Sequence, residues 1–374
     1  MQASRRGDRL SESGDRSNDG TPRVAERTGR RKGGAVTIHE VARHASVSPM
    51  TVSRVINGES NVRDSTRATV MEAVRALNYR PNPAARLLAG ARDTRIALIY
   101  SNPSASYLSE MLVGALDGSH RTAAQLVLDR WDNLKPAQEK AAAQRLSEGI
   151  AGVILPPPLC ESKAIAAAFA AEGVPVVALA TGKAREDVSC VRIDDFHAAH
   201  EMTAHLIANG HSRIAFIIGQ SAQTASAQRL AGFHAAMEEA GHEVDPALVV
   251  QGFFSYKSGL EATEKLLARK RLPTAIFASN DDMAAAAISV AHRRGLDVPR
   301  DLSVVGFDDT PIATTVWPEL TTVRQPIAAM AEAAINLLLH KIRRPKDRHV
   351  NQAVDHLVPY LLVKRDSVAP PRKP

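Results

Sequence analysis

From residue 95 onward, short apolar runs alternate with longer amphipathic stretches. A strand that is buried on both faces is apolar throughout, so these runs predict the strands of parallel sheets covered by helices. The predicted strands are Ile96–Tyr100, Leu126–Leu128, Gly152–Leu155, Val174–Leu179, Cys190–Ile193, Ile214–Ile218, Leu248–Gln251, Ala275–Ala278, Leu302–Phe307 and Leu320–Val323. The predicted helices are Ser109–Ala124, Ala137–Glu148, His197–Asn209, Ala227–Ala240, Ser258–Arg269 and Asp282–Arg294. The alternation indicates an α/β fold.

So many strands exceed what one twisted sheet usually holds, so the pattern favours two lobes that cross over within Asp194–His211. We expect a core over residues 94–366. The first lobe would take residues 94–193 and 325–345, and the second 194–322 and 347–366. The apolar segment His356–Arg365 would return to the second lobe as a strand, and residues 367–374 would form a disordered tail.

A different pattern, three short helices, occupies residues 36–80. Thr37 and Glu40 have the spacing of a capping box, which predicts a helix from Ile38 to about Ala45. Ser48 and Pro49 then predict the cap and first position of a helix that continues to Ile56. A third helix is expected from about Ser65 to Leu77. Two short helices joined by a tight turn are typical of an all-α helix-turn-helix domain, although a plain helical bundle is the alternative.

The flanks of this domain have little apolar surface. Residues 1–34 contain almost no large apolar side chains and are expected to form a disordered basic arm. Residues 81–91 contain a second cap followed by proline, Asn82-Pro83, and a possible helix over Ala84–Ala89. So short a helix is marginal in water, so this hinge or linker would need a partner to fold.

The charge is uneven along the chain. Residues 1–90 hold 16 Arg or Lys and 9 Asp or Glu, which accounts for the whole net charge of +7. A basic head on a neutral body suggests a partner that is a polyanion, although a basic tail without a specific partner would look the same. The two cysteines, Cys160 and Cys190, exclude a disulfide scaffold and indicate reduced, buried thiols. No apolar run is long enough to span a membrane and no secretory signal is apparent, so we expect a cytoplasmic protein.

Between Val36 and about Arg365 the sequence resembles the lactose-repressor and purine-repressor (LacI/GalR) family of bacterial transcription regulators. The most specific similarity lies in Thr37-Ile-His-Glu-Val-Ala and Val47-Ser-Pro-Met-Thr-Val-Ser-Arg-Val-Ile-Asn57-Gly, followed by Leu77-Asn-Tyr-Arg-Pro-Asn82 and Leu88-Ala-Gly90. The core matches more loosely, for example at Ser279-Asn-Asp-Asp282, Val305-Gly-Phe-Asp-Asp309 and Leu320-Thr-Thr-Val-Arg-Gln325. The resemblance implies a helix-turn-helix domain joined to a two-lobed core like that of periplasmic binding proteins.

This resemblance also implies a function: a ligand-responsive repressor that binds a palindromic, double-stranded DNA operator as a homodimer. A small effector, expected to be a sugar or sugar derivative, would change the affinity for DNA. No heptad segment follows Arg365, so a dimer is expected rather than a tail-assembled tetramer. No catalytic residue, metal, cofactor or membrane partner is expected.

In the resemblance, the helix from Ser48 to Ile56 lies in the DNA major groove. The implied DNA-binding residues are Thr37, Ser48, Pro49, Met50, Thr51, Ser53, Arg54, Asn57, Asn82 and Leu88. Arg54 can bond a guanine edge through two N–H groups, or contact phosphate instead. Leu88 takes the place of the leucine that wedges into the minor groove and kinks the duplex, unless it belongs to a plain amphipathic linker. Ser46 stands where many relatives have glycine in the turn.

The effector is expected between the lobes, where the carboxyl ends of the parallel strands meet. The implied effector-binding residues are Ser101, Asn102, Tyr107, Arg229, Phe254, Asn280, Asp308 and Gln325. Arg229 is expected to precede a helix. Paired donors and acceptors of this kind suit the neighbouring hydroxyls of a sugar, although caps and contacts between lobes could use the same residues. Pro156-Pro-Pro158 and Ala180 stand where relatives often have polar groups, so the first lobe offers fewer of them.

Two rival functions have different requirements. A small-molecule binder or enzyme with a basic appendage would need a catalytic motif, and no Gly-rich dinucleotide loop, phosphate loop or G-x-S-x-G elbow occurs. The pairs Asp194-Asp195, Asp281-Asp282 and Asp308-Asp309 could in principle serve as acid and base, and His197 and His200 could share a metal; adjacent side chains usually diverge, and a solvated helix face explains the histidines. A secreted sugar-binding protein would require a signal peptide.

Overall fold

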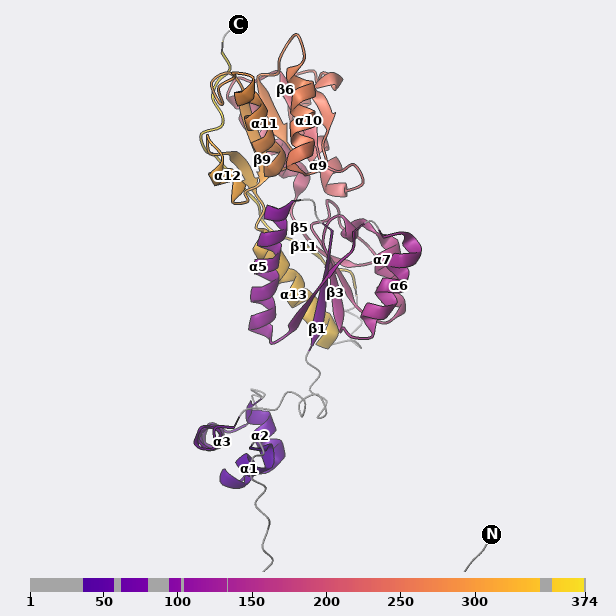
Figure 1. Cartoon of the computed structure of the whole chain (residues 1–374), viewed down its shortest axis with the longest axis vertical. Coiled ribbons are helices and arrows are strands. Elements are labelled where there is room, and N and C mark those ends of the chain that lie inside the picture. The colour runs from indigo at the N-terminus through magenta and orange to yellow at the C-terminus, as the bar shows by residue number, and fades with distance from the viewer. Residues whose placement is uncertain are drawn as a thin grey trace, which may run out of the picture. The chain divides into compact units, whose positions relative to one another are not determined.

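The computed structural model describes residues 36–56, 62–79, 94–101, 104–132, 134–343 and 352–372. The chain divides into two compact units, residues 1–91 and 92–374, which we call the head and the core (Figure 1). The expected arm and hinge helix lie outside the described residues. Asn57, Asn82, Leu88 and Asn102 lie outside them as well.

The head consists of α1 (Ile38–His44), α2 (Pro49–Ile56) and α3 (Asp64–Ala76), close to their predicted bounds. Thr37 and Glu40 form the predicted capping box at the start of α1. Apolar residues from all three helices meet in a small core that includes Val41, Val52 and Val70. Ser46 in the turn has a φ of 54°, a left-handed conformation that costs a residue with a side chain ~1 kcal/mol.

The first lobe of the core is a six-stranded sheet in the order β11-β5-β4-β3-β1-β2. Helices α5 and α13 pack together on one face of this sheet, and α6 and α7 cover the other (Figure 1). The strands are β1 (Arg95–Tyr100), β2 (Gln125–Arg130), β3 (Gly152–Leu155), β4 (Val176–Leu179), β5 (Ser189–Arg192) and β11 (Asp355–Leu357). The helices are α5 (Ala105–Thr122), α6 (Pro136–Ser147), η1 (Leu159–Glu161), α7 (Lys163–Ala171) and α13 (Ile327–Arg343).

The second lobe repeats this plan with the strand order β12-β10-β9-β8-β6-β7. Helices α8 and α9 pack together on one side, and α10 and α11 on the other. The strands are β6 (Ile214–Ile218), β7 (Val249–Gln251), β8 (Ala275–Ala278), β9 (Ser303–Asp308), β10 (Thr321–Arg324) and β12 (Leu361–Val363). The helices are α8 (Asp195–Ala208), α9 (Thr224–Glu239), η2 (Pro246–Leu248), α10 (Tyr256–Leu267), α11 (Asp281–Arg293) and α12 (Ile312–Thr315).

The C-terminal segment differs from the prediction in two ways. Residues 347–366 do not all belong to the second lobe, because β11 pairs in parallel with β5 of the first sheet before β12 pairs antiparallel with β10. The expected disordered tail is instead packed as far as residue 372. Ser367 is fully buried, and its hydroxyl donates to the Val304 carbonyl (2.6 Å) and accepts from the Thr321 amide (2.8 Å). Backbone hydrogen bonds and one buried hydroxyl thus hold a segment whose composition suggested no order.

Candidate functional site

In the head, α2 presents a mixed outward face. Val52 and Val55 are buried against the other helices, which leaves Met50 and Arg54 exposed on the opposite side. Met50 is 64% exposed, unusual for a methionine in a packed domain. Met50 and Arg54 are therefore accessible, and their roles in DNA binding stay predictions.

Two of the residues implied to bind DNA, Thr37 and Ser48, stand at the N-termini of α1 and α2. Ser48 Oγ accepts a hydrogen bond from the Thr51 amide (3.1 Å) and lies 2.9 Å from Thr51 Oγ1. Thr37 Oγ1 donates to Glu40 Oε2 (3.0 Å). Each of these N-termini already has an acceptor, since Glu40 Oε2 also accepts from the Thr37 amide (2.7 Å), and the DNA contacts of both residues stay predictions.

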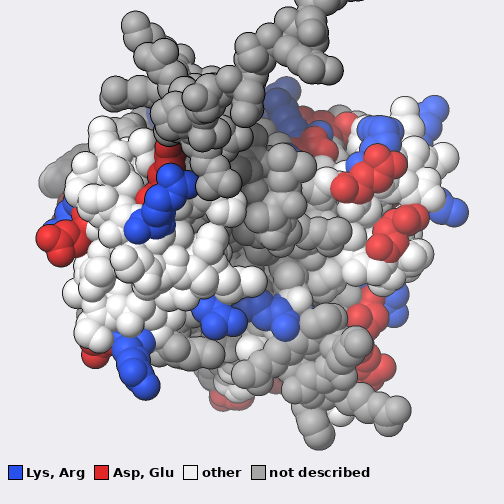
Figure 2. Space-filling view, turned by 90° about the horizontal axis from the view of Figure 1, so that it is seen from below, with Lys and Arg blue, Asp and Glu red and all other residues white. Residues whose placement is uncertain are grey.

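The head's charge is modest where the structure describes it. Its described residues carry five Arg, at positions 43, 54, 63, 67 and 75, against three acidic residues at 40, 64 and 72. They contribute +2 of the +7 found in residues 1–90. In Figure 2, which draws both units, Lys and Arg side chains and Asp and Glu side chains both occur across the described surface. Most of the positive excess therefore belongs to residues outside the described ranges.

In the core, a cavity lies between the two lobes. Six of the eight predicted effector-binding residues line it: Tyr107, Arg229, Phe254, Asn280, Asp308 and Gln325. Asn102 lies outside the described residues, and Ser101 lines a neighbouring hollow instead, together with Arg130, Trp131 and Asp132. The remaining lining residues are Ser104, Pro157, Ala180, Gln223 and Ala225.

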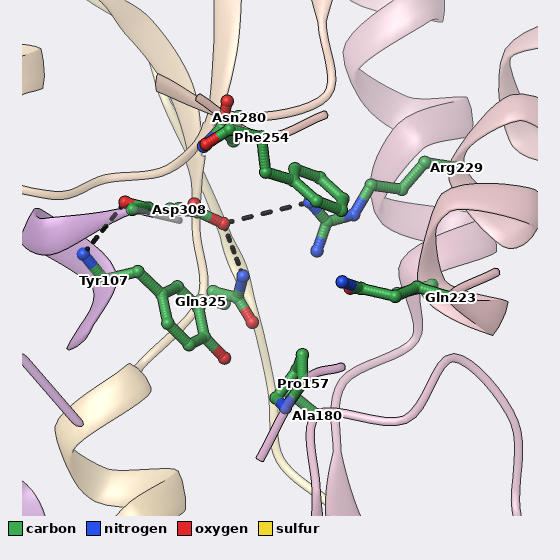
Figure 3. A pocket seen from close by; sticks show the side chains of 11 residues that line it. Tyr107, Pro157, Ala180, Gln223, Arg229, Phe254, Asn280, Asp308 and Gln325 are labelled. Carbon is green, nitrogen blue, oxygen red and sulfur yellow. Dashed lines mark hydrogen bonds and ion pairs between the residues drawn. The ribbon is translucent and has the colours of Figure 1, made fainter. Parts of the chain in front are cut away.

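These residues converge because the carboxyl ends of the strands in both sheets open toward the same space. Asp308 is the last residue of β9, Asn280 follows β8, and Gln325 follows β10. From the first lobe, Pro157 comes after β3 and Ala180 directly after β4. The polar groups thus come mainly from the second lobe, and the apolar wall from the first (Figure 3).

Arg229 is held from several sides. It lies inside α9 rather than before a helix as predicted. Its Nε donates to Asp195 Oδ1 (2.7 Å) and its Nη1 to the Ser279 carbonyl (2.6 Å). The guanidinium carbon stands 3.6 Å from the centre of the Phe307 ring, and Nη1 lies 3.8 Å from Asp308 Oδ1. The side chain is therefore fixed before any ligand arrives.

Asp308 is a buried carboxylate at the back of the cavity. It accepts a hydrogen bond from the Gln325 amide, and Figure 3 shows it between Gln325 and Arg229. Burial raises the pKa of Asp308 to about 7, although the Arg229 guanidinium lowers it. Its φ of 115° is a conformation that side chains rarely adopt, and the lining residues Ala180 and Phe254 also have positive φ. Backbone strain of this kind concentrates at functional sites.

Asn280 has a structural role as well as a place in the lining. Its Oδ1 accepts from the Met283 amide as the cap of α11 (3.1 Å), and its Nδ2 donates to the Phe254 carbonyl (3.1 Å). Gly219 makes room for Phe254, because a Cβ there would stand 2.0 Å from the ring. Asn280 and Gly219 thus place the aromatic ring at the cavity.

Five lining residues are absent from the sequence-based site prediction. Pro157 and Ala180 were noted only as departures from the family pattern, yet they form the apolar wall. Ser104 is the N-cap of α5, and a serine before a helix is a signal that the sequence contains, whereas Gln223 precedes α9 without a side-chain capping bond and gives no such signal. Ala225 carries no chemical signal that could have identified it.

The lobes also touch at the rim of the cavity. Glu161 of the first lobe accepts hydrogen bonds from the Thr224 amide (2.9 Å) and hydroxyl (2.7 Å) at the start of α9. Gly182 N donates to Thr224 Oγ1 (2.9 Å), and a Cβ at Gly182 would lie 2.3 Å from the Ala225 nitrogen. Across the cavity, Ser104 donates to Asp282. These contacts hold the lobes closed around the site.

The acidic pairs and histidines weighed as catalytic or metal groups have other partners. Asp281 accepts from the Thr310 amide (2.8 Å) and the Thr322 hydroxyl (2.6 Å), and Asp309 pairs with Arg324 and Arg365. His197 contacts Asp194, whereas His200 contacts Glu239. Within the described ranges, no group of three His, Cys, Asp or Glu side chains is placed to hold a metal. None of the described helices is long and apolar enough to cross a membrane.

Comparisons with known proteins match both units. Residues 37–82 match the family of bacterial regulatory proteins called the lacI family, and residues 203–368 match the periplasmic binding protein-like domain. Catabolite control protein A of Priestia megaterium is 36% identical over 81% of the chain and 91% of its own length. The HTH-type transcriptional repressor PurR of Proteus mirabilis is 34% identical over 89% of the chain and 97% of its own length.

Two solved structures extend this similarity to the fold. The lac repressor dimer bound to operator and the anti-inducer ONPF has a TM-score of 0.70 at 29% identity, covering 90% of the chain and 100% of that structure. The complex of the transcriptional regulator CelR with cellobiose has a TM-score of 0.67 at 32% identity, covering 89% and 99%.

Proposed function

The chain belongs to the lacI family of bacterial transcription regulators, and we propose that it is a repressor whose affinity for its operator depends on a carbohydrate bound between the lobes. Its relatives are transcriptional regulators, and we propose no catalytic activity or cofactor for this chain. The observation that carries the proposal is the cavity, where an arginine, a carboxylate and three carboxamides converge from separate strands and helices. The head supplies an exposed helix of the size that enters the DNA major groove.

The chemistry of the cavity supports a sugar. Asp308 offers acceptor oxygens, Arg229 and Asn280 offer donors, and Gln325 offers both. The Phe254 ring supplies an apolar face such as those on which sugar rings pack. The CelR structure, which holds cellobiose, supports the same class of ligand.

On the DNA side, we propose a homodimer on a palindromic site, in the cytoplasm. The lac repressor neighbour is a dimer on its operator, which supports this assembly. Arg54 would read a base, and Leu88 of each subunit would wedge into the minor groove. The effector would change the angle between the lobes and so the spacing of the two hinges. If the effector weakens DNA binding, DNA must weaken effector binding by the same factor.

A gel-shift assay tests the proposal. The full chain is titrated onto DNA from upstream of its own gene and the neighbouring genes, with and without a panel of sugars. We expect a sequence-specific complex whose affinity at least one sugar changes. If random DNA binds equally well, or no sugar alters the complex, the corresponding half of the proposal is wrong. Circular-permutation gels with Leu88→Ala test the hinge, since the variant should still bind the effector but lose the bend in the operator.

A further inference from the structure

The charge around the cavity identifies which kind of sugar it accepts. Among the described residues that line it, Arg229 is the only cationic side chain and Asp308 the only acidic one. The positive charge of Arg229 is already engaged, because its Nε donates to the buried Asp195 at 2.7 Å. An incoming anion would therefore meet the carboxylate of Asp308 without an unengaged cation to balance it.

More carboxyl groups lie directly behind the lining. Asp282 accepts from the lining residue Ser104, and Asp281, which is buried, stands next to the lining residue Asn280. Together with Asp195 and Asp308, these two residues make four carboxyl groups in or behind the lining. The lining itself contains one guanidinium group, that of Arg229. Burial raises the pKa of each of these carboxyl groups because it removes water from the charged form, and the same loss of water disfavours a charged ligand group beside them. The nearby Arg185 and Arg324 pair with Asp187 and Asp309 and do not line the cavity.

Helix N-termini are the other places where a protein binds anions, and three helices begin at this cavity. Each of these N-termini already has an acceptor. Glu161 accepts from the Thr224 amide at α9, Asn280 Oδ1 from the Met283 amide at α11, and Ser104 Oγ from the Tyr107 amide at α5. The wall formed by Pro157 and Ala180 has no side-chain polar group that could replace water around an anion.

We infer that the cavity selects an uncharged, hydroxyl-bearing sugar and excludes its phosphorylated and carboxylated forms. This inference rests on the proposed function and narrows its ligand class. Neutral hydroxyl groups can donate to Asp308 and accept from Arg229 without adding charge. A phosphate or carboxylate on the same ring would stand against a buried carboxylate, which is the arrangement that binding sites use to reject a wrong partner.

The test uses matched ligands that differ only at carbon 6. Glucose, galactose and mannose are each compared with their 6-phosphate and their uronate by calorimetry on the full chain at pH 7.5. For any ring that binds, we expect the neutral form to bind at least about a hundredfold more tightly than either anion. An anionic form that binds as tightly as its neutral parent would overturn the inference while leaving the sugar proposal intact. If none of the nine compounds binds, the sugar proposal fails and the inference fails with it.

A variant without the Asp308 charge shows whether the cavity rejects anions by charge or by size. Asp308→Asn keeps the size of the side chain, so the ratio between neutral and anionic affinity should shrink by about tenfold or more. Glu243→Gln removes a charge from an exposed position of the same lobe and serves as the matched control, with an unchanged ratio. An unchanged ratio in Asp308→Asn would show that the cavity rejects anions by size, and that the charge argument is wrong.

Discussion

The head and the core differ in how far their candidate functional residues are exposed to solvent. In the head, Arg54 and Met50 stand in solvent on a small helical scaffold, and the apolar positions between them build the core. In the core, Arg229 and Asp308 are buried and bonded to other parts of the protein. A substitution of Arg54 or Met50 should therefore change DNA binding alone, whereas a substitution of Arg229 should change ligand binding and folding together.

Arg229→Ala should have the most severe consequences. The substitution would leave the buried carboxyl groups of Asp195 and Asp308 without their cation, which should cost about 3–5 kcal/mol of unfolding free energy. Sugar binding should fall at least about a hundredfold, since the ligand also loses its donor. Chemical denaturation and calorimetry measure the two effects. Glu238→Ala, at an exposed position of the same helix, serves as the control. A variant of normal stability would contradict the account of a pre-fixed guanidinium.

Arg54→Ala should show the opposite signature. Because Arg54 is exposed, the unfolding free energy should change by less than about 0.5 kcal/mol. If Arg54 reads a guanine, operator affinity should drop by about 1–3 kcal/mol, and base preference should relax at one position per half-site. Arg54→Lys keeps the charge but loses the two-pronged geometry. Equal losses on operator and random DNA, with rescue by lysine, would show that Arg54 contacts phosphate only.

The pH dependence of stability should reveal the buried carboxylate. Asp308 has a folded pKa of about 7, above its usual value of 3.8, so the folded state binds the proton more tightly than the unfolded chain. The stability contribution is complete below pH 3.8 and is lost as the pH rises through about 7. Between pH 5 and 7 the loss should amount to at most about 2 kcal/mol. Urea denaturation of Asp308→Asn should show a flatter profile over this range, and equal slopes in both proteins would refute the assignment.

A substitution in the C-terminal segment should lower the stability of the protein without changing DNA binding. Ser367→Ala removes a buried hydroxyl that bridges the Val304 carbonyl and the Thr321 amide, so it should cost about 1–2 kcal/mol of stability. As a control, Ser147→Ala removes a partly exposed helical hydroxyl that donates only to the Ala143 carbonyl, and it should cost less. Neither variant should alter operator affinity. An unchanged stability in Ser367→Ala would mean that residues 367–372 add little to the fold.

The contrast between head and core also explains what the sequence could predict. The signals that predict helices α1 to α3, which are caps and apolar spacing, lie within each short helix and its flanks. The sequence therefore predicts the bounds of these helices to within about two residues. In the core, strand ends located Asn280, Asp308 and Gln325, because the α/β architecture places the carboxyl ends of strands at one edge. The family resemblance, and not the strand pattern, supplied Arg229 and Phe254. Local patterns could not show that Glu161 caps α9 from the other lobe, or that Asp195 holds Arg229. The buried serine at 367 and the split of residues 355–363 between two sheets likewise depend on distant partners.

Occupancy of the cavity between the lobes should control the affinity of the head for DNA. Fluorescence anisotropy of a labelled operator measures this link, with wild type and Asp308→Asn titrated in the absence and presence of the neutral hexose that binds most tightly. We expect equal operator affinity for the two proteins without sugar, a change of at least about fivefold in the wild type at saturating sugar, and a response in Asp308→Asn that needs a higher sugar concentration. Identical sugar responses in both proteins, or a variant that no longer binds operator without sugar, would contradict it.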